Sequence, residues 1–276
     1  MTSSPERFSL VGRTVAVTGA SGALGGSFAA ALVGAGASVA LLDVTTVDAA
    51  RLTTLQASAT GGARVAAFVC DVRDDRSVAD AHAAAEAELG PVDGLVNAAA
   101  IHAPPGADAA ALTGPFESGS SEASLAVLDV NLEGVVRCCR AFGGAMAARG
   151  RGAIVNVASH YGIVAPDQRM YASLRAQGVD FHKPAVYTTS KAGVIGLTRY
   201  LAAYWGESGV RVNTLSPGGV LDGQDPGFVA EYTSRTPLGR MASVDEYDGA
   251  VVFLLSDASS YMSGANLVMD GGFSVW

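Results

Sequence analysis

The sequence predicts an α/β protein built on one doubly wound parallel β-sheet of about seven strands, with helices on both faces. Its apolar runs are short and rich in β-branched residues, and helix-like stretches separate them. Nearly continuous apolar strands that alternate with helices are typical of a parallel sheet covered on both faces. The 276 residues suit a single domain over 1–276, and 49% hydrophobic against 16% charged residues indicates a large core.

The predicted strands cover residues 14–19, 38–44, 64–72, 92–100, 152–159, 210–218 and 266–272. Helices are expected over 24–35, 76–89, 124–149, 184–206 and 244–255. Pro184 stands where the fourth helix begins, which its fixed φ suits. Two segments, 162–183 and 219–237, break the alternation and follow the carboxyl ends of strands. Open α/β sheets bind ligands at these ends, so we expect both segments to be insertions that form the walls and lid of a substrate site.

Composition excludes several classes of function. The net charge of −8 and the scattered Lys and Arg residues disfavour nucleic acid as a partner. The three cysteines include no CxxC pair, which disfavours a zinc site or a disulfide framework and favours a reducing cytoplasm. No metal-ligand cluster appears. The uncharged stretch after Arg13 is too rich in glycine for a membrane span, and the N-terminus lacks the apolar region of a signal peptide.

The segment TVAVTGASGALGGSFAAALVGAGASVALLDV reads as strand, glycine turn, helix and a second strand that ends in an acid. Gly19 allows a tight turn and Gly25 allows close packing of the helix, so the N–H groups between them can cradle a pyrophosphate. Asp43 is placed to bind a ribose 2′-OH and to repel a 2′-phosphate. No Lys or Arg lies in the turn or directly after Asp43, so the sequence favours NAD over NADP. The alternative is a glycine turn beside an ordinary surface aspartate.

A tyrosine and a lysine, Tyr187 and Lys191, lie four residues apart in a predicted helix. Side chains at this spacing share a helix face, so the ammonium can lower the phenol pKa for proton transfer and also reach the ribose. Ser159, at the end of a strand, can hydrogen-bond the substrate oxygen. The YxxxK pattern is loose by itself. Its occurrence after a dinucleotide-binding turn indicates an oxidoreductase that transfers hydride between nicotinamide and a carbinol.

These motifs together resemble the short-chain dehydrogenase/reductase family over almost the whole chain. TGASGALG matches its glycine turn, CDV follows the third strand, NAAA stands where the family has NNAG, and SPGGV and DGG match its last strands. The resemblance implies a Rossmann-type sheet in which Ser159, Tyr187 and Lys191 are catalytic, and Asn131 binds a water that links Lys191 to solvent. We expect cofactor contacts from Gly19, Ser21, Gly22, Leu24, Gly25, Asp43, Asp71, Val72, Asn97, Ala98, Ala99, Tyr187, Lys191, Pro217, Gly218 and Val220.

The interval from Ser159 to Tyr187 is 28 residues, roughly twice that usual in the family, so an insertion separates them. The inserted segment is polar, which suits either a polar pocket or a contact with a neighbouring subunit. Together with SPGGVLDGQ and the ending DGGFSVW, it resembles bacterial dehydrogenases of sugars, including those of nonulosonate biosynthesis. We expect a polar substrate to contact His102, Ser159, Tyr161, Gln168, Arg169, Gly219 and Asp222. For Arg169 the alternative is a solvated surface side chain.

Two other functions remain open at this point. One is a 3-oxoacyl-thioester reductase, which would prefer NADPH and a basic docking patch, both disfavoured by Asp43 and the acidic composition. The other is a non-catalytic NAD-binding protein, which would not need the serine, tyrosine and lysine set. The aromatic helix VIGLTRYLAAYW and the segment EGVVRCCRAFGGAM resemble the family's four-helix subunit contact, which implies a homodimer or homotetramer.

Overall fold

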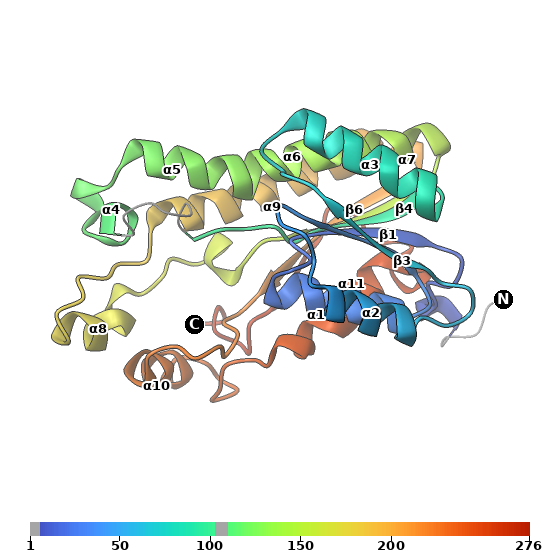
Figure 1. Cartoon of the computed structure of the whole chain (residues 1–276). Coiled ribbons are helices and arrows are strands. Elements are labelled where there is room, and N and C mark those ends of the chain that lie inside the picture. The colour runs from blue at the N-terminus through green and yellow to red at the C-terminus, as the bar shows by residue number, and fades with distance from the viewer. Residues whose placement is uncertain (1–5, 103–109) are drawn as a thin grey trace.

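A computed structural model describes residues 6–102 and 110–276, and its centre is one parallel sheet in the order β3-β2-β1-β4-β5-β6-β7 (Figure 1). The strands are β1 Thr14–Thr18, β2 Ser38–Asp43, β3 Val65–Val69, β4 Val92–Asn97, β5 Gly152–Val157, β6 Val210–Pro217 and β7 Asn266–Met269. This confirms the predicted doubly wound sheet. The strand order reverses between β1 and β4, so a crevice opens at their carboxyl ends.

Helices cover both faces of the sheet (Figure 1). One face carries α1 Ala23–Gly34, α2 Ala49–Ser58 and α11 Asp248–Leu255. The other carries α3 Asp75–Leu89, α9 Ala185–Trp205 and a long helix made of α5 Ser121–Leu128, α6 Gly134–Cys138 and α7 Gly144–Arg149. The short helices α4 Ala110–Thr113, α8 Ala172–Ala176 and α10 Pro226–Ser234 lie toward the carboxyl ends of the strands. The predicted helices are therefore present, but α2, α4, α8 and α10 were not expected.

Helix α2 has a weak sequence signal because only Leu55 of its residues is buried. Its N-terminus is nonetheless well defined, since the side chain of Asp48 accepts a hydrogen bond from the Arg51 backbone N–H at 2.9 Å. Such an N-cap satisfies one of the free donors at a helix start. The long helix 121–149 also differs from expectation, because π-helical turns at Asp129–Glu133 and Cys139–Gly143 interrupt it. Single π-turns of this kind are often found at functional sites.

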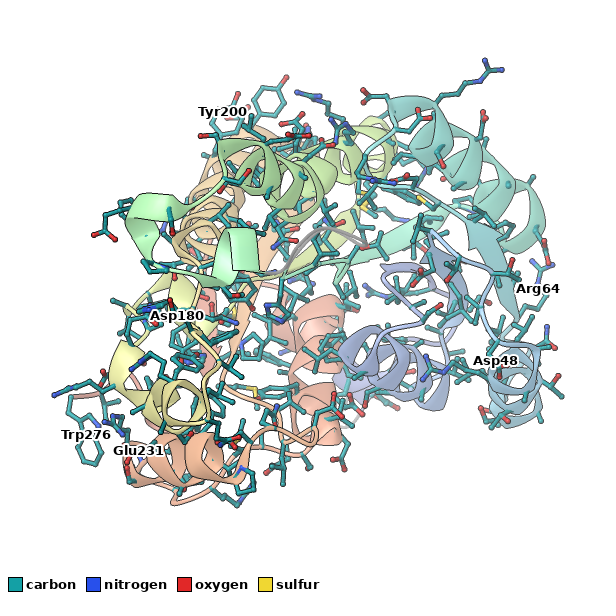
Figure 2. All side chains as sticks on the ribbon, turned by 60° about the vertical axis from the view of Figure 1, so that its left-hand side comes forward. Asp48, Arg64, Asp180, Tyr200, Glu231 and Trp276 are labelled. Atoms are coloured by element: carbon teal, nitrogen blue, oxygen red, sulfur yellow. The ribbon has the colours of Figure 1, made fainter. Side chains whose placement is uncertain are left out.

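The two predicted insertions fold together into a small lobe that holds α8 and α10. Ser173 donates a hydrogen bond to Asp225 at 2.6 Å, and Arg235 forms an ion pair with Asp167 at 3.1 Å. Figure 2 shows Asp180, Glu231 and the terminal Trp276 at this end of the molecule. Beneath the polar surface lies an aromatic cluster that consists of Tyr161, Met170, Tyr171, Tyr232, Met241 and Phe273. The insertions therefore have a core of their own beside the sheet.

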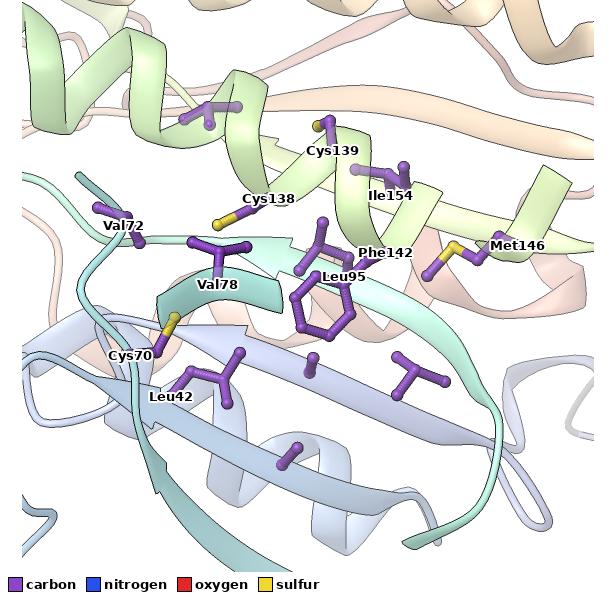
Figure 3. Packing of buried hydrophobic residues seen from close by; sticks show 14 of the residues in the cluster. Leu42, Cys70, Val72, Val78, Leu95, Cys138, Cys139, Phe142, Met146 and Ile154 are labelled. Atoms are coloured by element: carbon purple, nitrogen blue, oxygen red, sulfur yellow. The ribbon is translucent and has the colours of Figure 1, made fainter. Parts of the chain in front are cut away.

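The main core has two layers, one on each face of the sheet. Figure 3 shows part of the layer under the long helix, where Phe142 and Met146 pack against strand residues such as Leu95. Cys70, Cys138 and Cys139 are also buried in this layer and form no disulfide. Burial raises the pKa of Cys70 and of Cys139 to about 12, so both thiols are protonated. Among the described residues, no helix is both long and apolar enough to cross a membrane.

Candidate active site

The glycine turn between β1 and α1 is shaped by close backbone contacts. Gly19 has φ +68°, and a Cβ at this position would lie 2.7 Å from the Cα of Ala99. A Cβ on Gly25 would lie 2.2 Å from the carbonyl oxygen of Gly19. Helix α1 begins directly after Gly22, with no side-chain cap and no acid in its first turn. Its free N–H groups and positive dipole end therefore face the crevice, where a pyrophosphate fits.

The carboxylate of Asp43 lies beside this turn, as the sequence predicts. It accepts hydrogen bonds from the backbone N–H of Ser21 at 2.9 Å and of Thr45 at 3.3 Å. These bonds fix the carboxylate at the end of β2, where it lines a groove of about 350 Å³ together with Asp71, Val72 and Ala99. The groove has the position expected for the adenosine half of a dinucleotide.

A cation that the sequence analysis missed also reaches the turn. The guanidinium of Arg51, on α2, donates hydrogen bonds of 3.0 Å to the carbonyl oxygens of Ala20 and Ser21. The expectation that no Lys or Arg lies near the turn is therefore wrong, because α2 folds back over it. An Asp-x-x-Arg start to an unrecognised helix was the available signal. The site thus holds both an acid, which favours NAD, and a cation within reach of a 2′-phosphate.

On the adenine side, Asp71 is already paired. Its carboxylate binds the guanidinium of Arg73 at 2.6 Å, and the hydrogen bond from this group lowers the Asp71 pKa. Asn97 departs from expectation, because its side chain points into the interior and donates to Asn156 at 2.8 Å. The Asn97 amide is therefore part of the core and not of the groove, although Ala98 and Ala99, which follow it, do line the site. The Ser21 side chain is exposed and lines neither groove.

Ser159, Tyr187 and Lys191 meet at one wall of a cavity of about 620 Å³. The Ser159 hydroxyl accepts a hydrogen bond from the Tyr161 N–H at 3.1 Å and also bonds the Tyr187 phenol. Lys191 donates to the carbonyl oxygen of Val157 at 2.9 Å. A Cβ on Gly162 would lie 2.9 Å from the Lys191 backbone, so this glycine lets the serine turn pack directly on α9. The long insertion therefore does not separate the three groups.

The charges around Tyr187 differ from expectation. Burial raises its pKa, and only the hydrogen bond with Ser159 acts in the opposite direction. The Lys191 ammonium is 5.9 Å from the centre of the tyrosine ring, and burial lowers the lysine pKa to about 8. The prediction that Lys191 lowers the Tyr187 pKa is therefore wrong for this arrangement, because the desolvation of both groups outweighs their attraction.

Asn131 lies in the first π-helical turn and is fully buried. Its side chain accepts from the Ile101 N–H at 2.8 Å and donates to the Ile101 carbonyl at 2.9 Å. The same amide lies 3.4 Å from the hydroxyl of Ser190, the neighbour of Lys191 in sequence. Asn131 thus ties the long helix to α9 and to the end of β4, and its predicted water link to Lys191 stays a prediction.

The remaining wall of the cavity contains four of the expected substrate residues, His102, Tyr161, Gly219 and Asp222. Gln168 and Arg169 do not line it. The Arg169 side chain is 84% exposed and pairs with Asp167, so the solvated alternative holds for it. Sequence reasoning missed most of the lobe side of the cavity, which consists of Tyr171, Leu174, Phe181, Lys183, Gln224, Asp225, Phe228, Tyr232 and Met241.

The same cavity is lined by the glycine turn, through Gly19, Gly22 and Gly25, and by Pro217, Gly218 and Val220. A dinucleotide that lies along the turn would thus bring its nicotinamide next to Ser159 and Tyr187. Within 6–102 and 110–276, no group of three or more His, Cys, Asp or Glu side chains is placed to hold a metal ion. The geometry fits a nicotinamide cofactor and a proton-transfer pair.

A family comparison agrees with this geometry. The model of the short chain dehydrogenase family matches residues 13–224. The chain belongs to this family. It is an oxidoreductase of a family that uses nicotinamide cofactors and acts on CH–OH groups.

Three relatives illustrate the range of this short-chain dehydrogenase's neighbours. D-Threitol dehydrogenase of Mycolicibacterium smegmatis is 38% identical and covers 97% of this chain and 95% of its own. Galactitol 2-dehydrogenase (L-tagatose-forming) of Cereibacter sphaeroides is 37% identical and covers 98% of each chain. The crystal structure of a gluconate 5-dehydrogenase from Burkholderia cenocepacia, in complex with NADP and tartrate, has a TM-score of 0.82 at 30% identity and covers 98% of each chain. The likeness to sugar and polyol enzymes is confirmed.

Proposed function

We propose that this protein interconverts a secondary alcohol and a ketone on a polar substrate of the sugar or polyol type, with NAD(H) as its cofactor. One observation carries the proposal: Ser159, Tyr187 and Lys191 line a single cavity with the glycine turn. The polyol relatives support the substrate class. The acyl-thioester reductase alternative gains no support from these relatives.

The nicotinamide ring of the bound cofactor supplies the hydride acceptor or donor. Ser159 donates a hydrogen bond to the substrate oxygen, which its own bond from the Tyr161 N–H leaves its hydroxyl proton free to do. Tyr187 accepts the hydroxyl proton during oxidation and returns it during reduction. Lys191 holds positive charge beside the tyrosine and the expected ribose position.

Asp43 supports the preference for NAD, because its carboxylate is fixed at the end of β2 by two backbone donors. Arg51 is the counter-argument, since its guanidinium lies on the same turn. We propose that Asp43 dominates, because a 2′-phosphate in the groove would have to lie against this carboxylate. A cytoplasmic location is proposed from the three free, buried cysteines.

The direct test is Tyr187→Phe. Turnover of polyols such as threitol and galactitol with NAD should fall at least 1,000-fold on the scale of lost proton-transfer catalysis, because the phenyl ring cannot carry the proton. NADH affinity, measured by fluorescence titration, should stay within about threefold. If wild-type protein binds NADH but oxidises no polyol or sugar with either cofactor, the proposed activity is wrong.

A further inference from the structure

A second lysine, Lys183, lines the reacting wall of the cavity and has no part in the proposed mechanism. Its ammonium lies 4.3 Å from the centre of the Tyr187 ring. The same nitrogen is 3.3 Å from Nδ1 of His102, whose ring in turn packs 4.7 Å from the tyrosine ring. Lys183 therefore stands next to the group that we propose to transfer the proton.

The backbone of Lys183 is held rigidly at the point where the insertion ends. Its N–H donates to the side-chain oxygen of Gln168 at 2.8 Å, and its carbonyl accepts from the side-chain nitrogen of the same residue at 3.1 Å. Arg175 fixes this clamp by donating to the carbonyl oxygens of Gln168 and Phe181. Pro184, which follows, begins α9. Gln168 thus does not contact substrate, as the sequence analysis expected, but positions this lysine.

The charge of Lys183 is not balanced by any described side chain. None of the ion pairs within 6–102 and 110–276 includes it. Its hydrogen-bond partner His102 is neutral, because burial and the two nearby lysines lower the histidine pKa to about 4. Burial also lowers the pKa of Lys183 to about 8, so the group is charged at neutral pH. A partly buried ammonium with a neutral partner favours an anionic ligand.

The acids that line the cavity do not replace this ligand. The Asp225 carboxylate is taken by Ser173 at 2.6 Å, by Gln177 at 3.0 Å and by the Phe228 N–H at 3.0 Å, where it caps α10. Asp222 belongs to the same segment and is exposed to solvent. No arginine is among the described residues that line the cavity, so the wall offers a point charge and no bidentate fork for a phosphate.

We propose that Lys183 binds a carboxylate of the substrate, so that the substrate is a polyhydroxy acid and not a neutral polyol. The inference rests on the proposed function and narrows it. A single ammonium matches the single charge of a carboxylate, and the proximity of Lys183 to Tyr187 places that carboxylate within a few carbons of the reacting carbinol. The open polar wall of the cavity would accept the remaining hydroxyl groups.

The test compares matched pairs of an acid and its neutral polyol, D-gluconate with D-glucitol and D-threonate with D-threitol, each with NAD and NADP. Wild-type enzyme should show the higher kcat/KM for at least one acid. In Lys183→Met, which keeps the length of the side chain, the acid-to-polyol ratio of kcat/KM should fall by about tenfold to a hundredfold. Lys183→Arg, which keeps the charge, should retain most of the ratio. Arg169→Met, which removes a cation of the same segment outside the cavity, should leave the ratio unchanged.

NADH binding by fluorescence should be intact in all variants, which shows that each is folded. A wild-type preference for the polyol in both pairs would overturn the inference and leave the proposed function standing. An equal loss for acid and polyol in Lys183→Met, with a shifted pH profile, would also overturn it, because Lys183 would then act on Tyr187. Absence of turnover for every compound would instead remove the proposed function itself.

Discussion

At the scale of single residues, cofactor choice depends on two opposed charges beside the glycine turn. Asp43→Ala should lower kcat/KM with NAD and raise it with NADP, since the carboxylate no longer binds the ribose hydroxyls or repels a phosphate. The change in the NADP-to-NAD ratio should be at least tenfold. Initial rates with both cofactors at a fixed substrate concentration give the ratio.

Arg51→Leu provides the control for this change. It removes the cation that bonds Ala20 and Ser21, so in the Asp43→Ala background it should reverse the gain with NADP. A wild-type enzyme that already prefers NADP would show that Arg51, and not Asp43, decides the choice.

The raised pKa of Tyr187 gives the pH dependence a definite sign. Oxidation needs the deprotonated phenol, which is scarce at neutral pH and increases as pH approaches the tyrosine pKa. The kcat/KM for oxidation should therefore rise from about pH 6 to about pH 8, by up to about tenfold per unit, whereas reduction, which needs the phenol, should not rise. Rates in both directions at constant ionic strength test this, and an oxidation optimum below neutrality would contradict it.

At the scale of elements, the contact between α1 and the glycine turn should be sensitive to one methyl group. Gly25→Ala places a Cβ against the Gly19 carbonyl, at 2.2 Å before relaxation. We expect it to lower the free energy of unfolding by about 1–3 kcal/mol and to weaken cofactor binding. Gly34→Ala, in the last turn of the same helix, has no atom within 4 Å and should be neutral or stabilising by up to about 1 kcal/mol. Urea unfolding and NADH titration measure both effects, and equal results for the two variants would refute this account of α1 packing.

The elements also show what a sequence can predict here. All seven strands were located, because each is a compact apolar run that the sheet buries on two faces. Tyr187 and Lys191 could be paired because helix geometry fixes neighbours four residues apart. Arg51 and Lys183 could not be placed in this way, since they reach the site through tertiary contacts, one by α2 folding over the turn and the other by the Gln168 clamp. Neither contact follows from local periodicity.

At the scale of the whole molecule, one face of α9 carries aromatic side chains that nothing within the chain covers. Tyr200 and Tyr204 are 63% and 66% exposed, and their rings stack at 5.8 Å (Figure 2 shows Tyr200 at the surface). Leu125 of the adjacent α5 is also exposed. We propose that this surface is the subunit contact of a homodimer or homotetramer.

Size-exclusion chromatography with light scattering tests the assembly. Wild-type protein should have the mass of two or four chains, and the double variant Tyr200→Asp, Tyr204→Asp should have a lower mass, because two carboxylates would be buried in an apolar contact. Tyr261→Asp, at a fully exposed tyrosine elsewhere on the molecule, is the control and should keep the wild-type mass. A monomeric wild type would contradict the proposal.

The three thiols in the sheet core make the folded chain a blank background for chemical labelling. All three are buried, and burial raises the pKa of each, so maleimides and disulfide reagents at neutral pH should modify them only when the core opens. The rate of wild-type modification would then report global unfolding. A cysteine placed on the surface, as in Tyr261→Cys, would be the single reactive handle for a dye or a surface tether, with no native cysteine needing to be removed first.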